Sequence, residues 1–93
     1  MSIERIGVIG AGQMGSGIAH VLSLAGYDVV LEDINTEQLG KATALIQRNM
    51  QRQAARGLIK DEEIEPALKR IHTSQSLDGM RDRDIVLEAA TED

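Results

Sequence analysis

The sequence contains no cysteine, no phenylalanine and no tryptophan, and Tyr27 is its only aromatic residue. Without cysteine, disulfide scaffolds, thiolate metal sites and cysteine nucleophiles are excluded. With a single aromatic side chain, the base stacking that binders of single-stranded nucleic acid use is nearly unavailable. The net charge of −5 also argues against binding to a phosphate backbone. We therefore expect no nucleic-acid partner.

The sequence also lacks a long apolar run. No stretch approaches the roughly 18 residues that a membrane helix needs, and no signal peptide precedes the first core-like segment. We therefore expect no membrane partner, and the cytoplasm is assigned by default. Hydrophobic residues make up 42% of the 93 residues and charged residues 27%, which is typical of a globular protein. A chain this short can form one aliphatic core, so residues 1–93 are expected to form a single domain.

Segments with strand character alternate with segments of helical spacing. Strands are expected at residues 3–9, 28–31, 71–73 and 84–88, and helices at residues 14–25, at 36–56 and from residue 60 or 61 onward. This alternation predicts an α/β fold with a Rossmann-type parallel sheet, which is part of a doubly wound domain. The expected strand order is 3-2-1-4, with the first strand central and helices on both faces.

Two local patterns refine the helices. Apolar residues of the first helix share one face, which we expect to be buried; they are Met14, Ile18, Val21, Leu22 and Ala25. Asn35 is the expected N-cap of the second helix, and Gln38, three residues later, would complete a capping box. The second helix is expected to run to Arg56, because Gly57 is the first strong stop signal.

The one strong motif lies between the first strand and the first helix, and it reads Gly10-Ala11-Gly12-Gln13-Met14-Gly15. It fits the pattern G-x-G-x-x-G in its proper strand–turn–helix context. Gly10 would permit the tight turn, Gly12 the close approach of a pyrophosphate, and Gly15 the close packing of helix on strand. The N–H groups at the start of the helix would then face the pyrophosphate. The alternative is that these glycines form only a tight turn.

Asp33 ends the second strand, 23 residues after Gly10. A carboxylate at this position can accept hydrogen bonds from both hydroxyls of an adenosine ribose and would repel the 2′-phosphate of NADP, so the expected cofactor is NAD. The neighbouring Glu32 points to the other face of the strand by alternation. The alternative is that Asp33 is only a charge at the entry to a helix.

A basic segment stands out in this acidic chain, since residues 36–60 carry a net charge of +4. Helical spacing places four cations on one narrow face, namely Lys41, Arg48, Arg52 and Arg56. We call this set the basic stripe. Either it binds an anionic ligand or partner, or it is a solvated charged face. His20 and His72 are more plausibly structural than catalytic, and the sequence shows no cluster of metal ligands.

The sequence resembles the 3-hydroxyacyl-CoA dehydrogenases, including the bacterial 3-hydroxybutyryl-CoA dehydrogenases. The resemblance extends over residues 6–20, 26–34 and 87–93 in the same order, and it includes the long helix with Ala55-Arg56-Gly57. Members of this family interconvert 3-hydroxyacyl-CoA and 3-oxoacyl-CoA by hydride transfer to or from NAD. The resemblance implies that residues 10–15 hold the pyrophosphate and Asp33 the ribose. It also implies that Ala89 and Glu92 line the nicotinamide end, and that Asn49 and Arg56 contact the CoA part of the substrate.

Members of the family continue beyond this length, with a general-base histidine, further substrate ligands and a helical domain that forms the dimer. The resemblance therefore identifies the chain as the N-terminal NAD-binding part of such an enzyme, inactive alone and part of a homo-oligomer. General-base chemistry needs a group within reach of the substrate hydroxyl, and none is recognisable in these residues. The alternatives are a stand-alone, non-catalytic NAD-binding module and the N-terminal part of a 3-hydroxyisobutyrate-type dehydrogenase.

Overall fold

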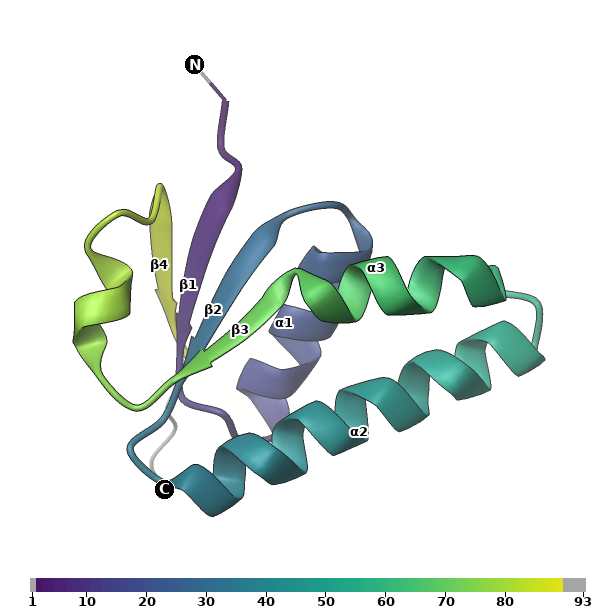
Figure 1. The fold of residues 1–93 in the computed structure, drawn as a ribbon, viewed down its shortest axis with the longest axis horizontal. Coiled ribbons are helices and arrows are strands. Elements are labelled where there is room, and N and C mark those ends of the chain that lie inside the picture. The colour runs from purple at the N-terminus through teal and green to yellow at the C-terminus, as the bar shows by residue number, and fades with distance from the viewer. Residues whose placement is uncertain (1, 90–93) are drawn as a thin grey trace.

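The computed structural model describes residues 2–89, in which four parallel strands form one sheet (Figure 1). The strand order is β3-β2-β1-β4, so the predicted order and the central position of the first strand are confirmed. In chain order the elements are β1 (Arg5–Ile9), α1 (Gln13–Leu24), β2 (Asp28–Glu32), α2 (Thr36–Ala55), η1 (Asp61–Glu63), α3 (Ile64–Lys69), β3 (Ile71–Ser74), η2 (Leu77–Met80) and β4 (Ile85–Glu88). No helix among these is long and apolar enough to cross a membrane.

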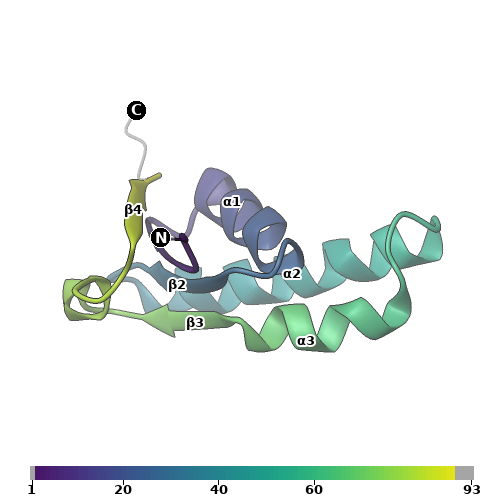
Figure 2. The same ribbon diagram turned by 90° about the horizontal axis from the view of Figure 1, so that it is seen from above.

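Helical segments lie on both faces of the sheet. Helices α1, α2 and α3 contact one another on one face, and the short helix η2 lies on the other (Figure 2). Strand alternation explains the division, because Ile6 and Val8 point into the core beneath α1 and α2. Gly7 points the opposite way, where Met80 and Arg83 cover it so closely that a Cβ would overlap the Met80 sulfur. The expected helices on both faces are therefore present, although the long ones share a face.

The buried face of α1 differs from the prediction. Small and polar residues are buried there instead of the large apolar ones: Gly15, Ser16, Ala19, His20 and Ser23. Met14 is 52% exposed and Val21 is 64% exposed, while Ile18 and Leu22 are only partly buried and Ala25 is exposed. The prediction was wrong because the glycine turn draws α1 so close to the sheet that only small side chains fit between them.

Helix α2 follows the prediction closely. Its buried face consists of Leu39, Ala42, Ile46 and Met50. The helix ends at Ala55, and Gly57 follows with a φ of 77°, a conformation that favours glycine. The cations of the basic stripe all lie on the exposed side of the helix. The long helix is thus anchored through one apolar face and presents its charges to solvent.

Candidate functional site

The glycine turn lies at the carboxyl end of β1, at the central position of the sheet (Figure 1). Gly10 has a φ of 100°, which a residue with a Cβ rarely adopts. Its N–H donates a hydrogen bond of 2.7 Å to the carbonyl of Glu32 at the end of β2. A Cβ on Gly15 would overlap the carbonyl oxygen of Gly10, so the close helix–strand packing predicted for Gly15 is present.

The N-terminus of α1 is open toward solvent. Gly12 is the N-cap, and among the described residues no side chain caps the helix and no acidic residue lies in its first turn. A Cβ on Gly12 would meet only the Gln38 side chain, at 4.0 Å. Backbone N–H groups at a helix start attract anions, and here nothing negative in the first turn competes for them. This end of α1 is therefore suited to a phosphate.

Asp33 lies beside the glycine turn, as predicted, but its carboxylate also binds the backbone. Its Oδ2 accepts a hydrogen bond of 3.0 Å from Ala11 N–H, and its Oδ1 accepts one of 2.9 Å from Asn35 N–H. A carboxylate has about four lone-pair sites, so it can still accept hydrogen bonds from a ligand. Asp33 therefore has a structural role in the turn as well as the expected position for binding a ribose.

Gln38 is a site residue that the sequence analysis assigned only to a capping box. Its backbone N–H does donate to Asn35 Oδ1, at 3.1 Å, so Asn35 is the N-cap as predicted. Its side chain does not return to the Asn35 N–H. Instead, Gln38 Nε2 donates a hydrogen bond of 3.0 Å to the carbonyl of Ala11. No local signal in the sequence shows whether the Gln38 side chain binds the Asn35 N–H or the Ala11 carbonyl, because Ala11 lies 27 residues earlier in the chain.

These residues enclose an open cavity of about 440 Å³ at the carboxyl edge of the sheet, lined by Gly10, Gly12, Gln13, Met14, Asp33, Gln38 and Ala89. Ala11 and Gly15 lie just behind it, and Ala11 is buried. Ala89 follows β4, and its N–H donates 2.8 Å to the Ile9 carbonyl. Six of the nine residues proposed for a cofactor thus line one cavity, together with Gln38, and two more, Ala11 and Gly15, lie behind its wall. Glu92 lies outside the described residues.

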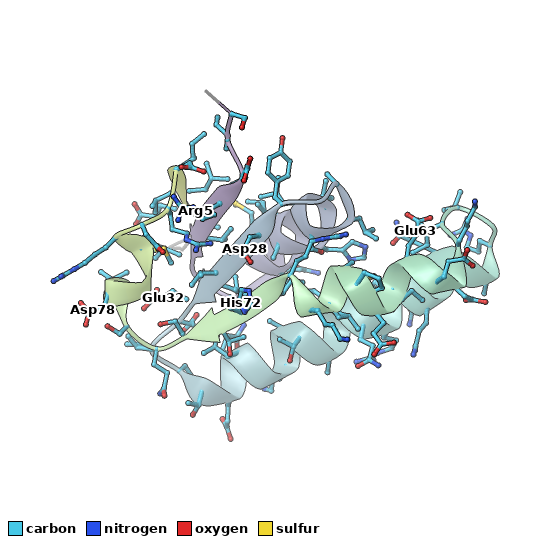
Figure 3. All side chains as sticks on the ribbon, turned by 45° about the horizontal axis from the view of Figure 1, so that its top comes forward. Arg5, Asp28, Glu32, Glu63, His72 and Asp78 are labelled. Atoms are coloured by element: carbon cyan, nitrogen blue, oxygen red, sulfur yellow. The ribbon has the colours of Figure 1, made fainter. Side chains whose placement is uncertain are left out.

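Glu32 lies on the opposite face of β2, as alternation predicts, and does not line the cavity. The residue is buried, at only 5% exposure, and lies near the η2 side of the sheet (Figure 3). Burial, and secondarily the charge of the adjacent Asp33, raise the pKa of the Glu32 carboxyl. Glu32 is therefore excluded as a ligand in this cavity.

The basic stripe is separate from the cavity. Its four cations make no ion pair with any described residue within 4 Å, and none of them lines the cavity. Arg56 is the exposed C-cap of α2, and Asn49 is half-buried two turns earlier. At 100° per residue, Asn49 and Arg56 share a face of the helix. The structure thus brings these two residues together with each other but not with the glycine turn.

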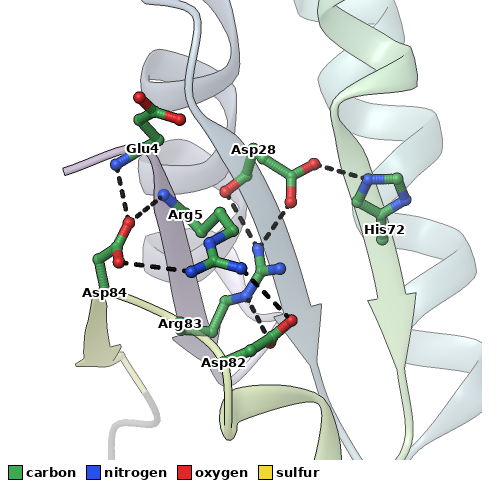
Figure 4. A network of polar contacts seen from close by, with 7 residues as sticks. All are labelled: Glu4, Arg5, Asp28, His72, Asp82, Arg83 and Asp84. Atoms are coloured by element: carbon green, nitrogen blue, oxygen red, sulfur yellow. Dashed lines mark hydrogen bonds and ion pairs between the residues drawn. The ribbon is translucent and has the colours of Figure 1, made fainter. Parts of the chain in front are cut away.

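Neither histidine belongs to the site. His20 Nε2 lies 2.7 Å from Gln53 Oε1, between α1 and α2. His72 Nε2 lies 2.8 Å from Asp28 Oδ1, between β3 and β2 (Figure 3). The His72–Asp28 pair lies at the end of the sheet opposite to the cavity, where it joins a network with Arg83 (Figure 4). Residues 2–89 contain no group of three or more histidine or acidic side chains that could hold a metal ion.

Comparison with known proteins agrees with this geometry. The family model for the NAD-binding domain of 3-hydroxyacyl-CoA dehydrogenase matches residues 5–93. The 3-hydroxybutyryl-CoA dehydrogenase of Bradyrhizobium diazoefficiens is 47% identical over 90 residues, which are 97% of this chain and 31% of the relative. A probable 3-hydroxybutyryl-CoA dehydrogenase of Bacillus subtilis is 38% identical over 92 residues, 99% of this chain and 32% of the relative.

Solved structures show the same relationship. The crystal structure of (S)-3-hydroxybutyryl-CoA dehydrogenase from Ralstonia eutropha has a TM-score of 0.94 at 37% identity, covering 99% of this chain and 32% of that one. The Escherichia coli K12 enzyme has a TM-score of 0.93 at 34% identity, covering 100% and 20%. The chain thus spans about one third or less of the proteins it matches. It belongs to the family of the NAD-binding domain of 3-hydroxyacyl-CoA dehydrogenases.

Proposed function

We propose that this chain binds NAD in the cavity at the carboxyl edge of the sheet, as the cofactor-binding part of an oxidoreductase that interconverts 3-hydroxyacyl-CoA and 3-oxoacyl-CoA. The observation that carries the proposal is the meeting of three features in one cavity. These features are an open helix N-terminus, a glycine turn without side chains in the way, and the carboxylate of Asp33. Each fits a different part of a dinucleotide.

The residues fit NAD part by part. The pyrophosphate would lie against residues 10–15, where the missing Cβ of Gly12 leaves the backbone open and the N-terminus of α1 supplies N–H groups. Asp33 would accept hydrogen bonds from the adenosine ribose through the lone pairs that the turn leaves free. Ala89 would lie toward the nicotinamide end, because it follows β4 on the other side of β1. Glu92 is proposed beside it from the family resemblance alone.

The substrate would be an acyl-CoA. NAD supplies the hydride acceptor or donor when it is bound, while the chain's own residues bind and orient the two ligands. Arg56 and Asn49 would contact the CoA part, since the half-buried Asn49 and the exposed Arg56 lie on one side of α2, next to cations that suit phosphates. Among the described residues, no histidine or carboxylate other than Asp33 lines the cavity, so these residues include no evident general base.

The test is a titration of the 93-residue chain with NAD and with NADP, monitored by calorimetry or NMR. We expect NAD to bind more tightly and to shift the resonances of residues 10–15 and 33. A second assay adds 3-hydroxybutyryl-CoA and NAD to the purified chain, and we expect no formation of NADH. Equal binding of NAD and NADP would overturn the assignment of Asp33. Turnover would show that a catalytic group is present in these 93 residues.

A further inference from the structure

Gln38 connects α2 to the glycine turn through a side-chain hydrogen bond. Its Nε2 donates to the Ala11 carbonyl at 3.0 Å, and its side chain lines the cavity. The Ala11 carbonyl also lies 3.4 Å from the Ser16 hydroxyl, which donates to it from within α1. Ala11 itself is buried, so its carbonyl depends on these donors for hydrogen bonding.

The Gln38 side chain is available for this bond because Asp33 has taken its usual partner. In a capping box, the residue at the third helical position binds the N–H of the N-cap. Here the N–H of Asn35 donates instead to Asp33 Oδ1, at 2.9 Å. The Gln38 amide is thereby left to reach across to the turn. Asp33 and Gln38 thus act together on the same segment.

The two side chains hold successive peptide groups of the turn. The Ala11 N–H donates to Asp33 Oδ2, and the Ala11 carbonyl accepts from Gln38. In a trans peptide the carbonyl and the following N–H point in opposite directions, so holding the Ala11 carbonyl also sets the direction of the Gly12 N–H. Gly12 lines the cavity at the start of α1. A side chain from α2 therefore orients a backbone donor at the place where an anion would bind.

We propose that Gln38 is a positioning residue for the pyrophosphate of NAD, acting through the Ala11–Gly12 peptide. The inference rests on the proposed binding of NAD in this cavity. It requires a hydrogen-bond donor at the end of the residue-38 side chain, because the Ala11 carbonyl can only accept. A glutamate has nearly the same shape, but its carboxylate would face that carbonyl without a proton and would repel the pyrophosphate.

The test compares Gln38→Met and Gln38→Glu with the wild-type chain. Methionine keeps the length of the side chain and removes the donor. Gln51→Met, on the exposed side of the same helix, is the matched control. NMR titrations measure the Kd of NAD, ADP-ribose and adenosine. Amide hydrogen exchange of Ala11 in the free protein measures how stable the conformation of the glycine turn is. Thermal unfolding reports whether each variant folds.

Losing one net hydrogen bond should weaken the binding of NAD and ADP-ribose by about 2- to 12-fold in Gln38→Met. It should also speed the exchange of the Ala11 N–H, because Asp33 alone then holds this residue of the turn from outside α1. Gln38→Glu should lose more NAD affinity, and Gln51→Met should change nothing. Adenosine should be weakened least, since it lacks the pyrophosphate; an equal loss for adenosine would overturn positioning in favour of direct contact. If the wild-type chain binds NAD, and Gln38→Met has the same affinity for NAD and the same Ala11 exchange rate as the wild type, only this inference would be overturned. Failure of the wild-type chain to bind NAD would instead overturn the proposed function.

Discussion

The carboxylate of Asp33 accepts a hydrogen bond of 3.0 Å from the backbone N–H of Ala11, although the two residues lie 22 positions apart. This bond joins the end of β2 to the turn after β1, so the residue proposed to bind the ribose also shapes the proposed pyrophosphate site. Substitution of Asp33 therefore affects both parts of the cavity. Only a comparison of two cofactors can separate these effects.

Asp33→Ala should weaken NAD binding by roughly 10- to 150-fold, because a hydrogen bond to a charged group contributes about 1.5–3 kcal/mol. NADP should lose less or gain, since the substitution also removes the charge that repels its 2′-phosphate. Loosening of the turn would weaken both cofactors alike, so the ratio of the two affinities is the informative quantity. Calorimetry that gives the same ratio for wild type and Asp33→Ala would remove Asp33 as the ribose ligand.

Two glycines of α1 provide a matched pair. Gly15→Ala should destabilise the chain by about 1–3 kcal/mol, because its Cβ would overlap the Gly10 carbonyl oxygen and the backbone must shift. A Cβ added at Gly17 would have no neighbouring heavy atom within 4 Å. Gly17→Ala should therefore stabilise by about 0.5–1 kcal/mol through helix propensity. Urea unfolding measures both, and a Gly15→Ala chain as stable as Gly17→Ala would contradict the packing role of Gly15.

The strands and the glycine motif could be predicted because their signals are local, and the order of the sheet followed from the alternation of strands and helices. Gly10 and Gly15 occupy fixed places in a short motif, and Asp33 follows directly after a recognisable strand. The end of α2 was predicted for the same reason, since Gly57 marks it. The position of Ala89 in the cavity came from family resemblance and not from any property of alanine.

The other features depend on tertiary contacts that no local pattern reports. Periodicity placed Met14 and Val21 in the core, but the packing of Gly15 against the Gly10 carbonyl brings α1 so close to the sheet that they lie at the surface. The capping pattern paired Gln38 with Asn35, but Asp33 occupies the Asn35 N–H. In both cases residues distant in sequence decided between arrangements that local sequence allows equally.

The basic stripe gives a prediction for a dehydrogenase that contains this domain together with the remaining two thirds found in its relatives. There, Arg56→Glu should raise the KM for acyl-CoA by much more than the KM for NAD, because Arg56 is exposed on α2 and distant from the cavity lining. High salt should reduce the difference, since exposed charges are screened. Steady-state kinetics at two ionic strengths measure this. Equal effects on both ligands would make the stripe a solvated face.

The outer edge of β4 should promote self-association of the 93-residue chain. Within residues 2–89 no strand pairs with this edge, and Val86 and Leu87 are 43% and 37% exposed. Unpaired apolar edges are templates for strand pairing between chains. We expect dimers or larger species in light scattering, and Val86→Lys should reduce them. A clean monomer at high wild-type concentration would contradict this expectation.

Arg83 forms the centre of the polar network at the opposite end of the sheet (Figure 4). Its side chain is only 7% exposed, and its guanidinium lies 2.8 Å from Asp28 Oδ2 and 3.3 Å from Asp82 Oδ1. Burial alone would raise the pKa of the Asp28 carboxyl, but the hydrogen bonds from Arg83 and His72 outweigh burial and lower the pKa below its usual 3.8. Asp28 therefore stabilises the fold in its charged form.

The sign of the pH dependence follows from this lowered pKa. A carboxyl whose pKa is lower in the folded state contributes stability that is present above its unfolded pKa, and that is lost as the pH falls through the folded value. Arg83→Met should cost about 1–2 kcal/mol at pH 7, a modest loss because Asp28 is 38% exposed and water replaces part of the interaction. The loss should shrink as the pH falls below 3.8 toward the lowered pKa of Asp28 in the folded wild type, because the wild-type carboxyl then becomes protonated as well.

Arg81→Met is the matched control, since Arg81 and Asp78 are 3.9 Å apart with side chains 86% and 85% exposed. Such a surface pair contributes little, so this variant should stay within about 0.5 kcal/mol of wild type at every pH. Urea unfolding of the three chains between pH 3 and pH 7 provides the comparison. A deficit in Arg83→Met that is the same at pH 3 and pH 7 would assign the role of Arg83 to the packing of its stem over Gly7, and not to its charge.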